Sequence, residues 1–423
     1  MESLSIKKTN LLLYACTLML CLFILARDII GVGIPGMVFA VMVATAGLVL
    51  KIDQFKIFLF FLFPFTCGVP GYTMLVSIIV LVAKSLGKVP IRRLQILPVV
   101  FVALLELFNC LIHVGDVDIS GYASFISFTA VFFFILFDKS NYKQSRECLI
   151  AFILGTLFVC VVIYYKMITE YGLDMILMGH LRGAMGDVNK EGTGKLITNG
   201  NNVAYLSIVL ISILLLGAKR LKMLSSLCNS LLMLSILIGM GSFSRTWMLL
   251  FASIIVVYLL YQRSLKMLFV LVLISGILIL IFPNILDGFT NVMTERMTSE
   301  NIGTMGGRST IFSHYNEIWS QKLLYILFGT SVTFHNDVLN YYIAMHNMTQ
   351  QIYVCIGVIG LLLYVYLFGR FFKEKYAGNK TLINYLPFFA GIMFLQSIQF
   401  LQPYFLMLPL LPAFYAFFIR SKK

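Results

Sequence analysis

Charge is scarce in this chain. Charged residues occupy 12% of its 423 positions, apolar residues occupy 60%, and the mean hydropathy is +0.93. Soluble domains carry about 25% charged residues, so this composition excludes a soluble fold for most of the chain. Apolar runs of about 16–20 residues recur instead. Each is long enough to cross a hydrocarbon layer of ~30 Å as a helix, and helices satisfy their own backbone groups in lipid.

Metal-binding and disulfide patterns are also missing. The eight cysteines form no CxxC pair and lie in or beside apolar runs, and the five histidines show no HxxxH spacing. We therefore expect no zinc site, no disulfide framework and no cofactor. The formal charge of +14 comes from basic residues scattered over short loops, a distribution that argues against nucleic acid as a partner.

The apolar runs predict an all-α polytopic membrane protein that forms a single integral membrane domain over residues 1–423. The candidate spans cover about 11–26, 33–50, 96–112, 120–137, 148–167, 200–218, 223–240, 246–261, 267–284, 351–369, 382–400 and 404–419, which makes about 12 transmembrane helices. Prolines and glycines interrupt the stretch 57–84. This stretch is either a short membrane hairpin or two short spans, which would bring the total to about 14.

The distribution of basic residues predicts the orientation. Lys and Arg accumulate on the cytoplasmic side of membrane proteins. With the N-terminus inside, 23 of the 32 Lys and Arg residues fall on that side. Both termini are then cytoplasmic, and two long loops, 168–199 and 285–350, face outward. Long loops in a compact protein are often functional, and all five histidines lie on this outer side or at its edge.

Three residues of the outer side combine into a candidate site for a phosphorylated substrate. Arg245, Arg308 and His346 each lie near the predicted start of a helix, and Ser244 is the predicted N-cap before Arg245. Helix N-termini and arginine both bind phosphate. The helix dipole also disfavours imidazolium, so a neutral His346 can accept a proton from a hydroxyl. The alternatives are an interfacial arginine at 245, a surface salt bridge at 308 and a polar cap at 346.

Glu106 is the ionisable residue that lies well inside a predicted span. With Asn109, Cys110 and His113 it forms a polar stripe at helical spacing. A carboxylate within a membrane is costly and is often functional. It equally can join helices through hydrogen bonds, and the sequence leaves both readings open.

The outer motifs resemble those of the bacterial O-antigen ligase and O-antigen or capsule polymerase (Wzy-type) family. They are Ser244-Arg245, Gly307-Arg308 leading through Trp319 to Phe328-Gly329, His346-Asn347, and Gly357-Val358-Ile359-Gly360 in the next span. An amphipathic helix is predicted after Arg308 from the spacing of Ile311, Phe312, Tyr315, Ile318 and Trp319. The motifs cover roughly residues 240–365.

The resemblance implies a glycosyltransferase of GT-C-like architecture in the bacterial cytoplasmic (inner) membrane. Its donor would be a glycan on undecaprenyl diphosphate, and it would need no metal. Arg245 and Arg308 would hold the diphosphate, and His346 would act on the acceptor. Arg182 is a weaker third clamp residue, and His335 is the second histidine followed by asparagine. Further expected contacts to substrate are Asn347, Trp319, Asn202 and Glu106.

The expected reaction is polymerisation of lipid-linked repeat units with inversion at the anomeric carbon. The alternative acceptor is lipid A-core, which would make the protein an O-antigen ligase. A flippase for lipid-linked oligosaccharide is a rival from another class, but flippases need charges that line a cavity across the membrane, and here the cations cluster at one face. Membrane lipids, a chain-length regulator and the flippase of the same pathway are the expected partners.

Overall fold

The computed structural model is all-helical, with no strand in the part of the chain that it describes. This part comprises residues 2–68, 71–86, 91–138, 141–173, 200–262, 308–343, 345–376, 382–398, 400–401 and 406–419, with a few isolated positions between 269 and 294. Within it, five helices are long and apolar enough to cross a membrane. They belong to α1 (Glu2–Asp28), α5 (Arg93–His113), α6 (Ile119–Leu136), α7 (Asn141–Tyr171) and α19 (Met348–Tyr376). The predicted class of an all-α membrane protein is confirmed at this level.

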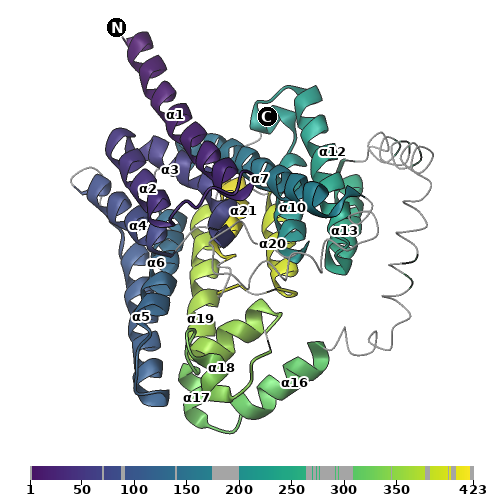
Figure 1. The fold of residues 1–423 in the computed structure, drawn as a ribbon. Helices are drawn as coiled ribbons and strands as arrows, with labels where there is room; N and C mark the ends of the chain where they lie inside the picture. The colour runs from purple at the N-terminus through teal and green to yellow at the C-terminus, as the bar shows by residue number, and fades with distance from the viewer. Residues whose placement is uncertain are drawn as a thin grey trace.

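Shorter helices accompany these five (Figure 1). They are α2 (Met37–Val49), α3 (Ile52–Leu62), α4 (Gly71–Ser85), α10 (Gly200–Leu214), α11 (Ala218–Leu221), α12 (Ser225–Gly241), α13 (Arg245–Gln262), α16 (Arg308–Trp319), α17 (Leu323–Phe328), α18 (His335–Leu339), α20 (Leu386–Leu395) and α21 (Leu411–Tyr415). The predicted span 267–284, most of the loop 168–199 and the beginning of the loop 285–350 lie outside the described ranges.

Helix α10 forms the core of one half of the molecule. All its residues are buried, and it packs against α12, α13 and α20. In the other half, α7 packs against α3, and α6 packs against both α4 and α5. A helix that is apolar on every side requires neighbours or lipid on every side, and α10 obtains them from other helices.

The C-terminal part departs from the two continuous spans predicted at 382–400 and 404–419. Helix α20 has ten residues and ends before an irregular stretch, and α21 is a short helix between two 3-10 turns, η4 and η5. Prolines at 387, 409 and 412 lack the N–H that a helix interior requires. Gln351 Oε1 accepts hydrogen bonds from the amides of Phe400 and Leu401 at 2.7 and 2.8 Å, which satisfies part of the irregular backbone.

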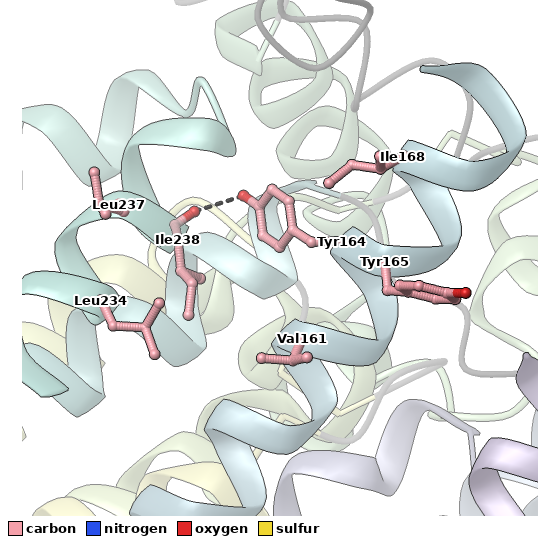
Figure 2. Close-up of a pocket in the computed structure, with 7 residues that line it drawn as sticks. All are labelled: Val161, Tyr164, Tyr165, Ile168, Leu234, Leu237 and Ile238. Atoms are coloured by element: carbon pink, nitrogen blue, oxygen red, sulfur yellow. Dashed lines mark hydrogen bonds between the residues drawn. The ribbon is translucent and has the colours of Figure 1, made fainter. Parts of the chain in front are cut away.

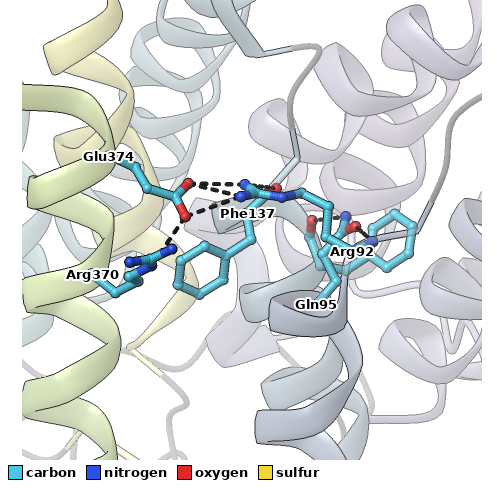
Figure 3. A network of polar contacts seen from close by, with 6 residues as sticks. Arg92, Gln95, Phe137, Arg370 and Glu374 are labelled. Atoms are coloured by element: carbon cyan, nitrogen blue, oxygen red, sulfur yellow. Dashed lines mark hydrogen bonds and ion pairs between the residues drawn. The ribbon is translucent and has the colours of Figure 1, made fainter. Parts of the chain in front are cut away.

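Polar contacts at the two ends of α5 define the two ends of the helix bundle. Just before its start, the Arg92 guanidinium donates to both carboxylate oxygens of Glu374 at 3.0 Å (Figure 3). At its other end, His113 Nε2 lies 3.1 Å from the carbonyl oxygen of Gly329. With 21 residues and ~1.5 Å per residue, α5 separates these contacts by about 30 Å. We refer to them as the Arg92 end and the His113 end.

The stretch 57–84 returns to the end from which it starts. Lys84 Nζ, in the last turn of α4, donates to the carbonyl oxygen of Leu50 just before α3 at 2.7 Å. Lys56 in α3 forms a buried ion pair with Asp138, which lies next to the end of α6 at the Arg92 end. The two helices are joined through the 3-10 turn η1 (Phe63–Gly68). This path agrees with the hairpin and with two short spans, because both return to the starting side.

Helix α19 is broken at Gly357, and the residues after α17 fill the break. Gly357 has φ 71°, so the carbonyls before it lose their helical partners. The amides of Thr330 and Ser331 donate to the carbonyl oxygens of Val354 and Cys355 at 2.9 and 3.0 Å. Non-helical backbone inside an apolar bundle is tolerated where its polar groups are bonded in this way.

Replacement of Gly357 by alanine should destabilise the protein by about 2–4 kcal/mol. A Cβ at this position would lie 2.2 Å from Leu327 O, and a positive φ is costly for any other residue. Gly369→Ala in the same helix is the matched control, because nothing lies within 4 Å of its Cβ position. Thermal unfolding in detergent should show a lower midpoint for Gly357→Ala alone, and equal midpoints would contradict this account of the break.

Candidate functional site

The polar stripe of α5 binds one short segment at the His113 end. The fully buried carboxylate of Glu106 accepts hydrogen bonds from Ser331 Oγ at 2.7 Å, from the Val332 amide at 2.8 Å, and from both the amide and the hydroxyl of Thr333 at 3.0 and 2.8 Å. A buried carboxylate is tolerated when it is fully hydrogen-bonded. Of the two readings that the sequence leaves open, joining separate elements through hydrogen bonds is the one that the structure displays.

The other stripe residues reach the same segment. Asn109 Nδ2 donates to the carbonyl oxygen of Phe328 at 2.7 Å, and Cys110 Sγ lies 3.6 Å from Ser331 Oγ. His113 completes the row through its contact with Gly329. Residues 328–334, here called the docked loop, therefore lie between α5 and the break in α19.

His335 follows directly after the docked loop and begins α18. Its ring is buried, with 7% of the residue exposed, and Nδ1 lies 3.0 Å from the carbonyl oxygen of Val332. Burial lowers the pKa of His335, and this effect exceeds the opposing influence of the Val332 hydrogen bond and of the Glu106 and Asp337 carboxylates. Burial therefore favours the neutral imidazole. Because a carbonyl can only accept, Nδ1 carries the hydrogen.

Helix α16 begins at Arg308 and lies against the two helices that follow the docked loop, α18 and α19. A helix is thus present where the spacing predicts an amphipathic one. Tyr315 is buried on it and donates to the carbonyl oxygen of Ile343 at 2.6 Å. The indole of Trp319 packs on Tyr353 of α19 with ring centroids 4.8 Å apart. These contacts hold α16, whose first residue is Arg308, against α18 and α19.

The His346-Asn347 pair precedes α19, and Asn347 is the residue that caps the helix. Asn347 Oδ1 accepts from the Gln350 amide at 2.9 Å, and Nδ2 donates to the carbonyl oxygen of Gln396 at 3.0 Å. Thr349 adds a hydrogen bond to the Gln396 side chain at 2.9 Å. The cap thus belongs to Asn347, and the half-buried His346 lies beside it at the edge of the site.

Arg245 is the first residue of α13 and follows a tight turn in which Phe243 has φ 48°. Ser244 occupies the predicted N-cap position, because its carbonyl accepts from the Met248 amide at 3.1 Å. The turn is anchored by Trp247, which is buried and donates to Ser207 Oγ of α10 at 3.1 Å.

The turn before Arg245 lies at the same end of α10 as the residues that hold Asn347. The start of α10 lies against it, since a Cβ on Gly200 would be 3.1 Å from the Ser242 carbonyl. Helix α20 packs along α10, with Tyr205 beside Phe394 at 5.8 Å between ring centroids. Gln396, which binds Asn347 and Thr349, follows two residues after Phe394. The starts of α10, α13 and α19 therefore gather around the end of α20.

An apolar groove of about 370 Å³ lies between α7 and α12, close to this turn (Figure 2). Tyr164 contributes a polar group to its lining, and the Tyr164 hydroxyl donates to the carbonyl oxygen of Ile238 at 2.6 Å. A Cβ on Gly241, the last residue of α12, would lie 2.7 Å from that hydroxyl. The remaining lining residues are Val161, Tyr165, Ile168, Leu234 and Leu237. The groove therefore runs along the helices toward the turn that precedes Arg245.

Two further predicted site residues, Asn202 and Arg182, have no described contact with the docked loop. Asn202 is buried in α10, with 1% of the residue exposed. Arg182 lies outside the described residues.

Sequence reasoning missed the docked loop. Its signal in the sequence is the pair of hydroxyl residues Ser331 and Thr333, which lie two positions apart between Gly329 and His335. Among the described residues no cluster of His, Cys, Asp and Glu is suited to hold a metal ion.

Comparisons with protein-family models, with curated proteins and with solved structures found no match to this chain. What the site does is therefore inferred from its own residues.

Replacement of Asn347 by alanine should lower the stability by about 0.5–2 kcal/mol, the usual cost of losing an N-cap. Asn347→Ser is the matched variant, because serine restores the cap to the Gln350 amide without restoring the bond to Gln396. Thermal unfolding should place Asn347→Ser between the wild type and Asn347→Ala. If both variants unfold at the wild-type temperature, Asn347 does not hold the start of α19.

Proposed function

We propose that this protein is a membrane glycosyltransferase that polymerises lipid-linked oligosaccharide repeat units. A glycan would pass from undecaprenyl diphosphate to the hydroxyl of an acceptor sugar at the outer face of the bacterial cytoplasmic membrane, with inversion and without a metal. The observation that carries the proposal is the gathering at the His113 end of the docked loop, the start of α19 and the turn before Arg245. This would be the outer end of a GT-C-like fold.

The charges of the two ends support this orientation. At the Arg92 end, Arg92 is paired with Glu374 and Lys56 with Asp138, as expected of structural ion pairs near cytoplasmic loops. At the His113 end, Arg245 and Arg308 each occupy the first position of a helix. A cation at a helix N-terminus is unfavourable by itself. A bound diphosphate would make these positions favourable, because the backbone amides and the guanidinium groups would both attract it.

The apolar groove supports a lipid-linked donor. An isoprenoid chain is an apolar ligand that fits a groove lined by Leu, Ile and Val side chains. The groove leads to the Gly241–Arg245 turn, so a tail in the groove would bring its diphosphate toward Arg245. The arginines would then stabilise the negative charge that develops on the leaving diphosphate as the anomeric C–O bond breaks.

The acceptor hydroxyl would attack the anomeric carbon from the face opposite the diphosphate. A sugar hydroxyl replaces the water of an inverting glycosidase, and a general base takes its proton. The resemblance points to His346 for this role. His335 is the other histidine at this end that is followed by asparagine, and burial lowers its pKa.

Loss of either proposed clamp arginine should reduce turnover by on the order of 10²–10³, as for loss of one oxyanion donor. The assay would incubate purified protein with defined undecaprenyl-diphosphate repeat units and size the glycans. Arg93→Ala is the matched control for Arg245→Ala and Arg308→Ala, because Arg93 also begins its helix but lies at the opposite end. If the wild-type protein left the glycans at the length of one repeat, as a flippase would, this result would contradict the proposed function. Wild-type rates in both clamp variants would contradict the clamp.

A bulky residue in the groove should weaken binding of the full-length donor. Leu237→Trp is expected to raise the KM for an undecaprenyl donor about tenfold, which corresponds to ~1.4 kcal/mol, and to affect a donor with a short isoprenoid chain much less. Leu249→Trp is the control, since Leu249 is 72% exposed on α13 and does not line the groove. An equal KM for both variants would argue against the tail site.

A further inference from the structure

We propose that Glu106 is a positioning residue that fixes the imidazole of His335 as the proton acceptor of the transfer reaction. The two residues are joined through a single peptide unit of the docked loop. This inference rests on the proposed function, because a proton acceptor has a role only if an acceptor hydroxyl reacts here.

The connection runs through the peptide between Val332 and Thr333. Its N–H, on Thr333, donates to Glu106 Oε1 at 3.0 Å, and its C=O, on Val332, accepts from His335 Nδ1 at 3.0 Å. The N–H and C=O of a peptide point in opposite directions, so this unit lies between the carboxylate and the imidazole. Hydrogen bonds in such a chain polarise one another. The negative carboxylate therefore strengthens the carbonyl as an acceptor for Nδ1–H.

This chain selects one tautomer of His335. With the hydrogen held on Nδ1, the lone pair is on Nε2, which is the nitrogen that can take a proton. Among the contacts of the described residues, Nδ1 is the bonded ring nitrogen, and Nε2 is the nitrogen that a substrate hydroxyl would meet. The charged groups that act on the ring are Glu106 from α5 and Asp337 from α18 itself. Both favour the imidazolium that forms when Nε2 accepts a proton.

The carboxylate is required because all the surrounding groups are donors. Oε1 accepts from Ser331 Oγ and from both Thr333 donors, and Oε2 accepts from the Val332 amide. Glutamine has the same size but replaces one oxygen by an NH₂ group. In Glu106→Gln a donor would face a donor, and the negative charge would be lost. The Val332–Thr333 peptide would turn, and the tautomer of His335 would no longer be fixed.

The reaction step balances without a further reagent. The acceptor O–H proton moves to Nε2 while its oxygen forms a bond to the anomeric carbon. The bond from that carbon to the diphosphate oxygen breaks, and the electron pair leaves with the diphosphate. The imidazolium then returns its proton to solvent before the next transfer.

Turnover of lipid-linked repeats by single and double variants tests the coupling. We expect Glu106→Gln to lower kcat about 10- to 100-fold with a donor KM within about twofold of wild type, and His335→Gln to lower kcat by on the order of 10²–10⁴. The double variant should be no slower than His335→Gln, since residues that act as a unit are not additive. Glu374→Gln is the control for loss of a bonded carboxylate at the other end of the bundle. Additive losses, or wild-type turnover in His335→Gln, would overturn the proposal.

Nitrogen-15 NMR of histidine-labelled protein in lipid nanodiscs gives a readout independent of activity. The His335 signals, assigned by their loss in His335→Gln, should show a neutral ring with the hydrogen on Nδ1 in the wild type and a mixture of tautomers in Glu106→Gln. A wild-type ring with the hydrogen on Nε2, or identical spectra for the two proteins, would overturn the role of Glu106. If the wild type lengthens no glycans while the NMR result holds, the proposed function fails and the link between Glu106 and His335 stands.

Discussion

The buried carboxylate of Glu106 is the constraint on which the His113 end depends. A carboxylate that is 0% exposed requires donors for both oxygens, and Ser331, Val332 and Thr333 supply them. Once these residues bind α5, Gly329 and Thr330 lie against α19, where the carbonyls before the break at Gly357 accept from the Thr330 and Ser331 amides. A Cβ on Gly329 would lie 2.3 Å from Cys355 O. The polar stripe, the helix break and the docked loop are thus parts of one arrangement.

The two ends of the bundle use charge differently. At the Arg92 end, Glu374 contacts both Arg92 and Arg370 (Figure 3), and Lys56 is paired with Asp138. At the His113 end, the carboxylate of Glu106 is bound by amides and hydroxyls, while arginines 245 and 308 begin their helices. The ion pairs join helices, whereas arginines at helix N-termini are suited to an anionic substrate. Arg93 also begins a helix, at the Arg92 end, so the proposed location of the chemistry depends as well on the docked loop and on the groove.

Much of the helical layout could be predicted from the sequence, because apolar runs and their breaks determine it directly. The stripe at Glu106, the helix after Arg308 and the N-cap position of Ser244 follow from local spacing. The docking of Ser331 and Thr333 could not, since it joins α5 to residues more than 200 positions away. The packing of residues 329–331 against the break in α19 is similarly non-local. The two short C-terminal helices differ from the predicted spans because Gln351 satisfies backbone that hydropathy alone would place in a helix.

Hydrogen–deuterium exchange of the docked loop tests the central claim most directly. The amides from Thr330 to Phe334 all donate to acceptors within the protein: Val354 O, Cys355 O, the Glu106 carboxylate and Ser331 Oγ. In the wild-type protein in nanodiscs, a peptide covering residues 329–334 should therefore exchange far more slowly than one covering the exposed residues Tyr342 and Ile343. Equally fast exchange of both peptides would show that Glu106 does not hold this loop, and the arrangement of the site would be wrong.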